Sequence, residues 1–460
     1  MFLMNKYEQS IQEQRDFFIA HLPFSFDYRK QQLISLKEAI QYYQEDLNEA
    51  LALDLGKPEF ESYMTEIGLV LHEIDLVVKQ LKHWMKPKKV KSPLFIQPAK
   101  SYIHPSPLGA CLIISPFNYP VSLTLSPLIA ALSAGNCCTI KTSELTPNVS
   151  LVLKKLIDST FAANYVNCIN GGVEEVTALL AQKFDHIFFT GSTEVAKLVM
   201  KQAAEHLTPV TLELGGKSPC IVCADANIDI AVNRIVYGKM LNAGQTCIAP
   251  DYVLVDDSVK DLFLTKIAQR IESIYGSDAS KSEDFGRIVN EKHALRISEL
   301  IDLDKVIVGG HADIERRYIA PTVMANVTLN DPIMQQEIFG PVLPVISFSE
   351  LDDVLTIVGQ LSHHPLAAYI FSEDKQVQHS LLSNIQAGGV VVNHCLQHAA
   401  NPNLPFGGVG NSGIGRYHGK FGFDCFSHQK SVLKAATWLD LSFVYPPYKG
   451  KLSMLKKLLK

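Results

Sequence analysis

Short β-rich apolar runs alternate with helix-compatible stretches along most of this chain, and the alternation restricts the fold more than any other feature of the sequence. The first series of predicted strands comprises residues 101–104, 110–114, 137–141, 167–170 and 186–190. Predicted helices separate most of these strands, at residues 122–134, 148–161, 173–182 and 193–205. Strands that alternate with helices predict a parallel sheet with crossover connections.

A second series of the same kind follows and indicates a second α/β unit. Its predicted strands are residues 220–223, 252–255, 305–308, 342–346, 367–371 and 389–393. Helices are expected between several of them, at 258–275 and 291–302, and also throughout residues 5–90, where apolar positions have helical spacing. The glycine-rich run 407–415 is expected to be a loop. The expected fold class is therefore α/β, with two doubly wound domains in succession.

The net charge and the number of cysteines indicate which partners and which cellular compartment to expect. A formal net charge of −5 gives no basic face for a phosphate backbone, so no nucleic-acid partner is expected. Nine cysteines, an odd number, occur without a recognisable secretory segment, which favours free thiols in a reducing, cytoplasmic setting. The apolar stretch 108–134 is interrupted by three prolines, so we expect a buried strand, turn and helix there rather than a membrane span.

Cys247 is the candidate nucleophile, although a single cysteine is more often a small buried hydrophobe. It follows Gly244, and a glycine beside a nucleophile allows close backbone approach to a ligand. Glu213 lies among apolar residues before two glycines, where a carboxylate is costly unless it is paired or used. It is either a general base or the partner of Lys217 in a salt bridge. Asn118, between two prolines, is either an oxyanion donor or a turn residue.

Two motifs are misleading. Residues 408–413 fit the glycine pattern of a dinucleotide-binding loop, but no clean strand precedes them and no acidic residue follows at the required distance. The two cysteines Cys220 and Cys223 fit the spacing of a redox or metal motif. They span a predicted strand, where their side chains point to opposite faces, and we expect no metal site.

Seven segments in order closely resemble those of the aldehyde dehydrogenase superfamily. They are Pro116–Pro120, Lys141–Glu144, Phe189–Thr193, Glu213–Pro219, Gly244–Cys247, Glu337–Pro341 and Leu404–Gly413. The resemblance covers about residues 10 to 435. The short N-terminus, Tyr119 after Asn118, and the segments 247–252 and 410–419 resemble the class 3-like branch. The fold implied is aldehyde dehydrogenase-like, with two doubly wound α/β domains and a small β bridging region.

The resemblance implies oxidation of an aldehyde to its carboxylate with NAD, and with NADP also accepted. Cys247 would attack the aldehyde, Asn118 and the Cys247 backbone N–H would hold the oxyanion, and Glu213 would activate water against the resulting thioester. By the same resemblance Lys141 and Glu144 would bind the adenosine ribose. The other cofactor positions implied are Gly191, Ser192, Thr193, Glu194, Val195, Ala196, Leu214, Gly215, Glu337 and Phe339.

Three positions depart from the family pattern, namely Phe117 in place of Trp, Thr142 in place of Pro and Ala196 in place of Gly. None of them removes a catalytic group. The substrate positions implied are Tyr119, Leu123, Thr246, Ile248, Asn393, His394 and Phe406. Most are apolar or aromatic, so a medium-chain, long-chain or aromatic aldehyde is expected.

The resemblance also implies a domain plan. Residues 1–88 and 108–215 would form the cofactor domain, 216–418 the catalytic domain, and 89–107 with 425–440 a bridging region that supports a homodimer. That region would combine a hairpin near 89–107 with a strand near 428–436, because an edge strand invites a partner.

The tail 441–460 is basic and amphipathic, with Leu452, Leu455 and Leu459 at helical spacing. It is either a solvated or subunit-packed end or a peripheral anchor on anionic lipid.

Three alternative functions stay open from the sequence. One is an acylating relative that transfers the acyl group to coenzyme A or phosphate, and another is a reductase of an activated acid. Such relatives generally lack the base at position 213, which is present here. The third is a catalytically silent scaffold, against which the intact Cys247, Glu213 and Asn118 argue.

Overall fold

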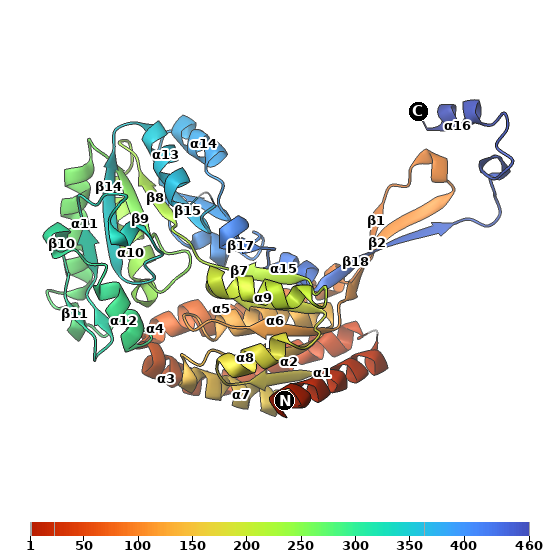
Figure 1. Ribbon diagram of the computed structural model, residues 1–460, viewed down its shortest axis with the longest axis horizontal. Coiled ribbons are helices and arrows are strands. Elements are labelled where there is room, and N and C mark those ends of the chain that lie inside the picture. Colours follow the sequence, from red (N-terminus) through yellow and green to blue (C-terminus); the bar gives the residue numbers. More distant parts are fainter. Residues whose placement is uncertain (1, 23, 363, 460) are drawn as a thin grey trace.

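The computed structural model describes residues 2–22, 24–362 and 364–459. Two open sheets, each flanked by helices, form the body of the molecule, and a narrow antiparallel arm projects from it (Figure 1). The predicted alternation of strands and helices is confirmed, because the strands predicted for both series form, with boundaries within about three residues of those expected.

The first sheet has the strand order β17-β7-β6-β3-β4-β5, and every pair except β17–β7 is parallel. Its strands are β3 (Ala110–Ile114), β4 (Cys137–Lys141), β5 (Val166–Ile169), β6 (His186–Thr190), β7 (Val210–Glu213) and β17 (Gly413–Ile414). Successive residues of β3 enter opposite cores: Leu112 packs with one cluster and Ile113 with the other. Both faces are therefore buried, as a parallel sheet between helices requires.

Helices from two parts of the chain surround this sheet. They are α1 (Phe2–His21), α2 (Phe26–Tyr42), α3 (Gln44–Leu55), α4 (Glu59–Ser62), α5 (Gly68–Trp84), α6 (Ser122–Ala134), α7 (Pro147–Thr160), α8 (Val173–Leu180), α9 (Thr193–Ala204) and α15 (Gly419–Cys425). A π-helical turn, Tyr63–Ile67, joins α4 to α5. The stretch 108–134 forms β3, a turn and α6, as predicted. Among the described residues, no helix combines the length and the apolar character needed to cross a bilayer.

The second sheet has the order β10-β13-β14-β9-β8-β15-β16, with only the β10–β13 pair antiparallel. Its strands are β8 (Pro219–Val222), β9 (Tyr252–Asp256), β10 (Val306–Val308), β13 (Thr322–Met324), β14 (Val342–Phe348), β15 (Ala367–Phe371) and β16 (Gly389–Val392). Its helices are α10 (Ile228–Met240), α11 (Lys260–Tyr275), α12 (Glu291–Ser298), α13 (Leu351–Leu361) and α14 (Lys375–Asn384). A small hairpin, β11 (Ala312–Asp313) with β12 (Tyr318–Ile319), occurs between β10 and β13 along the chain.

The arm is a three-stranded antiparallel sheet in the order β1-β2-β18. It consists of β1 (Lys88–Val90), β2 (Ala99–Pro107) and β18 (Ser427–Ala435), so the predicted hairpin and C-terminal strand lie together. The tail helix α16 (Leu452–Leu458) lies at the far end of the arm from the body (Figure 1).

The expectation of a loop over residues 407–415 is wrong in part, because Gly413–Ile414 form strand β17 against the end of β7. A Cβ at Gly413 would lie 2.5 Å from the carbonyl oxygen of Leu212, so only glycine permits this pairing. The pairing of Gly413 with Glu213 matters for the site, since it fixes the backbone of Glu213.

Candidate active site

Cys247 follows a strained turn at the end of α10. Asn242, Ala243 and Gly244 all have positive φ angles, of 53°, 50° and 74°. A Cβ at Gly244 would lie 2.2 Å from the carbonyl oxygen of Gly340. The sequence-based reason for Gly244, close approach to a ligand, is therefore corrected: this glycine allows close approach to another segment of backbone.

The side chain of Gln245 locks the loop before Cys247. Its amide nitrogen donates to the carbonyl oxygen of Arg287 at 2.9 Å, and its amide oxygen accepts from the N–H of Val289 at 2.9 Å. Cys247 itself is half-buried. Burial, together with the nearby carboxyl groups of Glu337 and Glu213, raises the pKa of the Cys247 thiol above its usual range. The thiol is thus protonated at neutral pH and needs a proton acceptor before it can act as a nucleophile.

Glu213 ends β7 and is buried, with 2% of its surface exposed. Within the described part of the chain, neither carboxyl oxygen has a hydrogen-bond partner. Burial raises the pKa of Glu213 well above its usual range. The salt bridge to Lys217, considered from the sequence, does not form, because Lys217 pairs with the buried carboxylate of Asp251. An unpartnered buried carboxyl group is costly, and it is typical of a reacting group.

Asn118 follows β3 and is tied to the loop that carries Cys247. Its side-chain amide donates to the carbonyl oxygen of Gln245 at 3.0 Å. Its own carbonyl oxygen accepts from the side-chain amide of Asn242 at 2.8 Å. Asn118 is therefore more than a turn residue, since it links the end of β3 to the turn before Cys247.

The predicted pyrophosphate position is the start of α9. Gly191 follows β6, and the side chain of the N-cap residue Ser192 accepts from the N–H of Val195 at 3.4 Å. The hydroxyl of Thr193 donates to the carbonyl oxygen of Asn411, and Ala196 is buried on the inner face of the helix. The exposed Glu194 pairs with Lys197. The amide end of a twelve-residue helix suits a phosphate group.

Lys141 and Glu144, the predicted ribose-binding residues, lie close together at the end of β4. The Nζ atom of Lys141 lies 3.4 Å from Oε2 of Glu144; Lys141 is buried and Glu144 half-exposed. Burial lowers the pKa of Lys141. Thr142, one of the departures from the family pattern, donates to the side-chain oxygen of Asn170 at 2.8 Å, a hydrogen bond that proline cannot make.

Glu337 and Phe339 lie next to the strand that ends at Glu213. The carboxyl of Glu337 rests on Gly215, whose neighbour Gly216 donates a backbone hydrogen bond to it. Burial raises the pKa of Glu337 to about 8. Phe339 has a φ of 50° and packs edge-on against Phe117 at 5.7 Å, so Phe117 stands in for the larger ring of the family. Leu214 is buried beside them.

The predicted substrate positions fall into two groups. The hydroxyl of Tyr119 lies 2.6 Å from that of Thr246, and the carbonyl of Ile248 accepts from Tyr369, so both flanks of Cys247 are fixed. Leu123 is half-buried on the first turn of α6, and Phe406 stacks on His418 at 5.0 Å.

The Asn393 side chain, predicted to line the substrate pocket, is hydrogen-bonded to the backbone, and its substrate role stays a prediction. Its amide bonds both backbone groups of Ser372, because it closes the turn after β15. The ring nitrogen Nδ1 of His394 likewise contacts the neighbouring Cys395 backbone.

Several buried residues near the site carried no signal in the sequence. Tyr417 is buried close enough to Glu213 and Cys247 for their charges to raise its pKa. Lys57 and Glu66, from the helical N-terminal segment, form a buried ion pair beside Asn118. No group of three or more possible metal ligands occurs among the described residues. Cys220 and Cys223 do not pair with each other, and all nine cysteines are free thiols.

Comparison with known proteins agrees with this geometry. The aldehyde dehydrogenase family model matches residues 6–432. The 4,4'-diaponeurosporen-aldehyde dehydrogenase of Staphylococcus aureus is 48% identical over 99% of this chain and 100% of its own length. The dimeric NADP-preferring aldehyde dehydrogenase of Rattus norvegicus is 42% identical over 98% of this chain and 99% of its own length. An aldehyde dehydrogenase family 3 protein, comG of Dictyostelium discoideum, is 44% identical over 94% of this chain and 93% of its own length.

A solved structure described as the substrate-bound state of Staphylococcus aureus AldH is also similar, with a TM-score of 0.96 and 47% identity over 99% of both chains. This chain belongs to the aldehyde dehydrogenase family. It is an oxidoreductase that oxidises aldehydes with a nicotinamide cofactor, and the predicted α/β fold and class 3-like resemblance are confirmed.

Proposed function

We propose that this enzyme converts an apolar aldehyde to its carboxylate through a thioester on Cys247, with Asn118 as the oxyanion donor and Glu213 as the general base. The observation that carries the proposal is the buried, unpartnered carboxyl of Glu213, close enough for its charge to raise the pKa of the Cys247 thiol. The same carboxyl favours hydrolysis over the acylating and reductive alternatives, because hydrolysis requires a base that accepts a proton from water.

The Cys247 thiol first gives its proton to water; the resulting thiolate attacks the aldehyde carbon, and the electron pair of the carbonyl moves to its oxygen. The second N–H of the Asn118 amide and the Cys247 backbone N–H stabilise that oxygen. A bound nicotinamide supplies the hydride acceptor. Loss of hydride leaves a thioester, and Glu213 takes a proton from the water that attacks it. The carbon–sulfur bond then breaks, which releases the carboxylate and restores the sulfur.

The residues around α9 suit a dinucleotide. Ser192 to Ala196 offer helix-end N–H groups for the pyrophosphate, and Glu144 presents a half-exposed carboxylate to accept the hydroxyls of a ribose. Gly215, Leu214, Glu337 and Phe339 would hold the nicotinamide half. A ribose carboxylate favours NAD, whereas a 42% identical relative is named NADP-preferring, so we propose that both are accepted.

The substrate proposal rests on the side chains beside Cys247. Tyr119, Leu123, Ile248 and Phe406 are buried or half-buried and largely apolar. A relative at 48% identity is named for a 4,4'-diaponeurosporen aldehyde. We therefore propose a medium-chain, long-chain or aromatic aldehyde.

The test is absorbance at 340 nm with aldehydes of increasing chain length, with NAD and then with NADP, for wild type and Cys247→Ser. Reduced cofactor that forms without coenzyme A or phosphate, and is lost in the variant, supports the proposal. A signal only after coenzyme A or phosphate is added would favour the acylating reaction. Full activity of Cys247→Ser would exclude the thioester route.

A homodimer formed through the arm is the second proposal. β18 is the edge strand of the arm, pairs only with β2 among the described strands, and exposes Leu433 with 52% of its surface. An exposed edge strand offers unpaired backbone groups to another chain. Light scattering after size exclusion should give twice the mass of 51.0 kDa, and Leu433→Glu should shift the protein toward the monomer. A monomeric wild type would exclude the proposal.

The nine free thiols support a reducing, cytoplasmic compartment.

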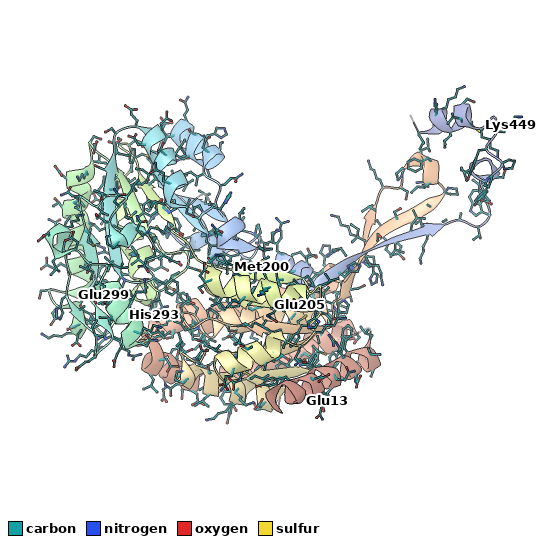
Figure 2. The ribbon with its side chains drawn as sticks, viewed as in Figure 1. Glu13, Met200, Glu205, His293, Glu299 and Lys449 are labelled. Atoms are coloured by element: carbon teal, nitrogen blue, oxygen red, sulfur yellow. The ribbon has the colours of Figure 1, made fainter. Side chains whose placement is uncertain are left out.

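We also propose peripheral contact of the tail with anionic lipid. Residues 427–460 contain seven lysines and one acidic residue, and Lys449 lies at the far end of the arm (Figure 2). Among the side chains of the tail helix that the structure describes, Leu452, Met454 and Leu455 are apolar and exposed. Deleting residues 449–460 should abolish binding to phosphatidylglycerol vesicles and spare activity. Equal vesicle binding by the truncated protein would exclude the contact.

A further inference from the structure

Lys57 is a buried cation that the proposed reaction does not use. It follows Gly56, the left-handed end of α3, and its side chain has no exposed surface. Its Nζ atom lies 2.5 Å from Oε1 of Glu66, whose side chain is equally buried. A buried ion pair contributes little net stability compared with well-packed apolar residues, so its presence calls for a role in placing other groups.

The other two contacts of the Lys57 ammonium both reach the candidate active site. Nζ lies 3.3 Å from the carbonyl oxygen of Asn118 and 4.3 Å from the ring centre of Tyr119. The ammonium carries three N–H groups, and its contacts are two hydrogen bonds to oxygen atoms and one cation–π contact with the Tyr119 ring. The Asn118 carbonyl belongs to the peptide unit that joins Asn118 to Tyr119, so Lys57 contacts two consecutive residues, one through its backbone and the other through its ring.

Glu66 anchors Lys57 to the start of α6. Its Oε2 atom accepts from the N–H groups of Val121 at 2.8 Å and Ser122 at 3.2 Å. A carboxylate at the positive end of a helix is stabilised there. The carboxylate lies in the π-helical turn Tyr63–Ile67, and such turns are frequent at functional sites.

Beyond Lys57, the contacts continue to the two residues that precede Cys247. The Asn118 amide donates to Gln245, and the Tyr119 hydroxyl contacts the hydroxyl of Thr246. We propose that Lys57 is a positioning residue for aldehyde oxidation: held by Glu66, it orients the Asn118 amide toward the oxyanion and the Tyr119 hydroxyl toward Thr246. This inference depends on the oxyanion role proposed for Asn118.

The test compares the double variant Lys57→Met/Glu66→Gln with the wild-type enzyme. The same double change is also made in the Asn118→Ala variant and compared with Asn118→Ala alone. Met keeps the length of the side chain, and Gln keeps an oxygen for the N–H groups of Val121 and Ser122 while it removes the unpaired charge. We expect kcat to fall at least about tenfold, since a misplaced oxyanion donor loses part of an effect of about 10²–10³. We expect an additional loss of less than about twofold in the Asn118→Ala background, because coupled residues are not additive.

A second measurement distinguishes a loss of Asn118 positioning from a loosening of the loop that carries Cys247. Iodoacetamide alkylates Cys247 without forming an oxyanion, so the double variant should be alkylated at the wild-type rate. Lys57→Arg provides a second variant that keeps a charge against Glu66; its planar guanidinium does not reproduce the three contacts and should give a similar loss of kcat. The matched control is Lys37→Met, which removes the surface partner of Asp75 and should leave kcat unchanged.

Each outcome decides the question. Wild-type kcat in the double variant, or a full additional loss in the Asn118→Ala background, would overturn the inference. Altered alkylation would also overturn it, because the loop itself would have moved. If Asn118→Ala alone keeps wild-type kcat, the proposed oxyanion role fails and the inference fails with it. If Asn118→Ala is impaired and the Lys57 variants are not, only the inference fails.

Discussion

The carboxyl group of Glu337 lies directly against the α-carbon of Gly215, so closely that a Cβ on this glycine would come within 2.1 Å of Oε2. The contact joins the segment before β14 to the residue pair that follows Glu213. Any side chain at position 215 must therefore move Glu337, and both residues belong to the proposed nicotinamide site.

Gly215→Ala should weaken binding of the cofactor and leave the Cys247 thiol unchanged. The added methyl displaces the Glu337 carboxyl, so we expect the KM for NAD to rise about tenfold, equivalent to about 1.4 kcal/mol. Steady-state kinetics at saturating aldehyde measure this change. Gly359→Ala is the matched control, because it lies in α13 with nothing within 4 Å of the added methyl. An unchanged KM for NAD in Gly215→Ala would show that Glu337 does not bind the cofactor.

Glu213→Gln should stop turnover after the first hydride transfer. Glutamine keeps the shape of the side chain and cannot accept a proton from water, so kcat should fall about 10²- to 10⁴-fold. Stopped-flow absorbance at 340 nm should show a burst of reduced cofactor, and intact-protein mass spectrometry should find an acyl group on the enzyme. Glu205→Gln, at the exposed end of α9, is the control and should behave as wild type (Figure 2). A variant without a burst would place Glu213 before hydride transfer.

Glu337→Gln should make Cys247 more acidic above pH 8. The pKa of Glu337 is raised to about 8, so above that pH its carboxylate is charged and opposes the thiolate. Removing the charge should speed alkylation by iodoacetamide at pH 9 about threefold, equivalent to about half a pKa unit. The exposed Glu299→Gln serves as the control. Slower alkylation in Glu337→Gln would contradict the predicted sign.

Glu73→Gln should reduce the loss of stability with rising pH. Burial raises the pKa of Glu73 to about 7, and its carboxyl accepts from Ser126 at 2.6 Å. The folded state therefore keeps a proton that the unfolded state releases from about pH 4.5, so stability falls between pH 4.5 and 7. We expect the variant to gain about 1–2 kcal/mol relative to wild type between pH 5 and pH 8. Urea unfolding at both pH values measures it, and parallel pH curves for the two proteins would contradict it.

The sequence predicts most of the fold because periodicity is a local property. The fully buried strands β3, β4, β6 and β15 are continuous apolar runs bounded by turn residues, and their bounds follow directly. Strands β7 and β17 escape prediction for a different reason. β17 has two residues and exists only through its pairing with β7, about 200 positions earlier, and no local pattern encodes such a contact.

The same division applies to the candidate site. Cys247, Glu213 and Asn118 each stand in a distinctive short segment, so their candidacy is visible in the sequence. Lys57 and Glu66 are charged residues in a helical region, where a solvent-exposed position is the usual expectation. Only the packing of that region against the start of α6 shows that both are buried beside Asn118. The role of Asn242 is hidden likewise, since its left-handed backbone depends on neighbours in space.

The path of the chain through the first sheet also bears on its synthesis. The sheet is begun by residue 110 and lacks its outermost strand until residue 414 has been made, after the whole second sheet. The helix that packs on α5 and α6 comes later still, at Gly419–Cys425. A nascent chain therefore cannot pair Glu213 with β17 until about nine-tenths of the protein has left the ribosome tunnel, so premature termination within residues 248–412 yields the Cys247 thiol with a base whose strand is paired on the β6 side alone.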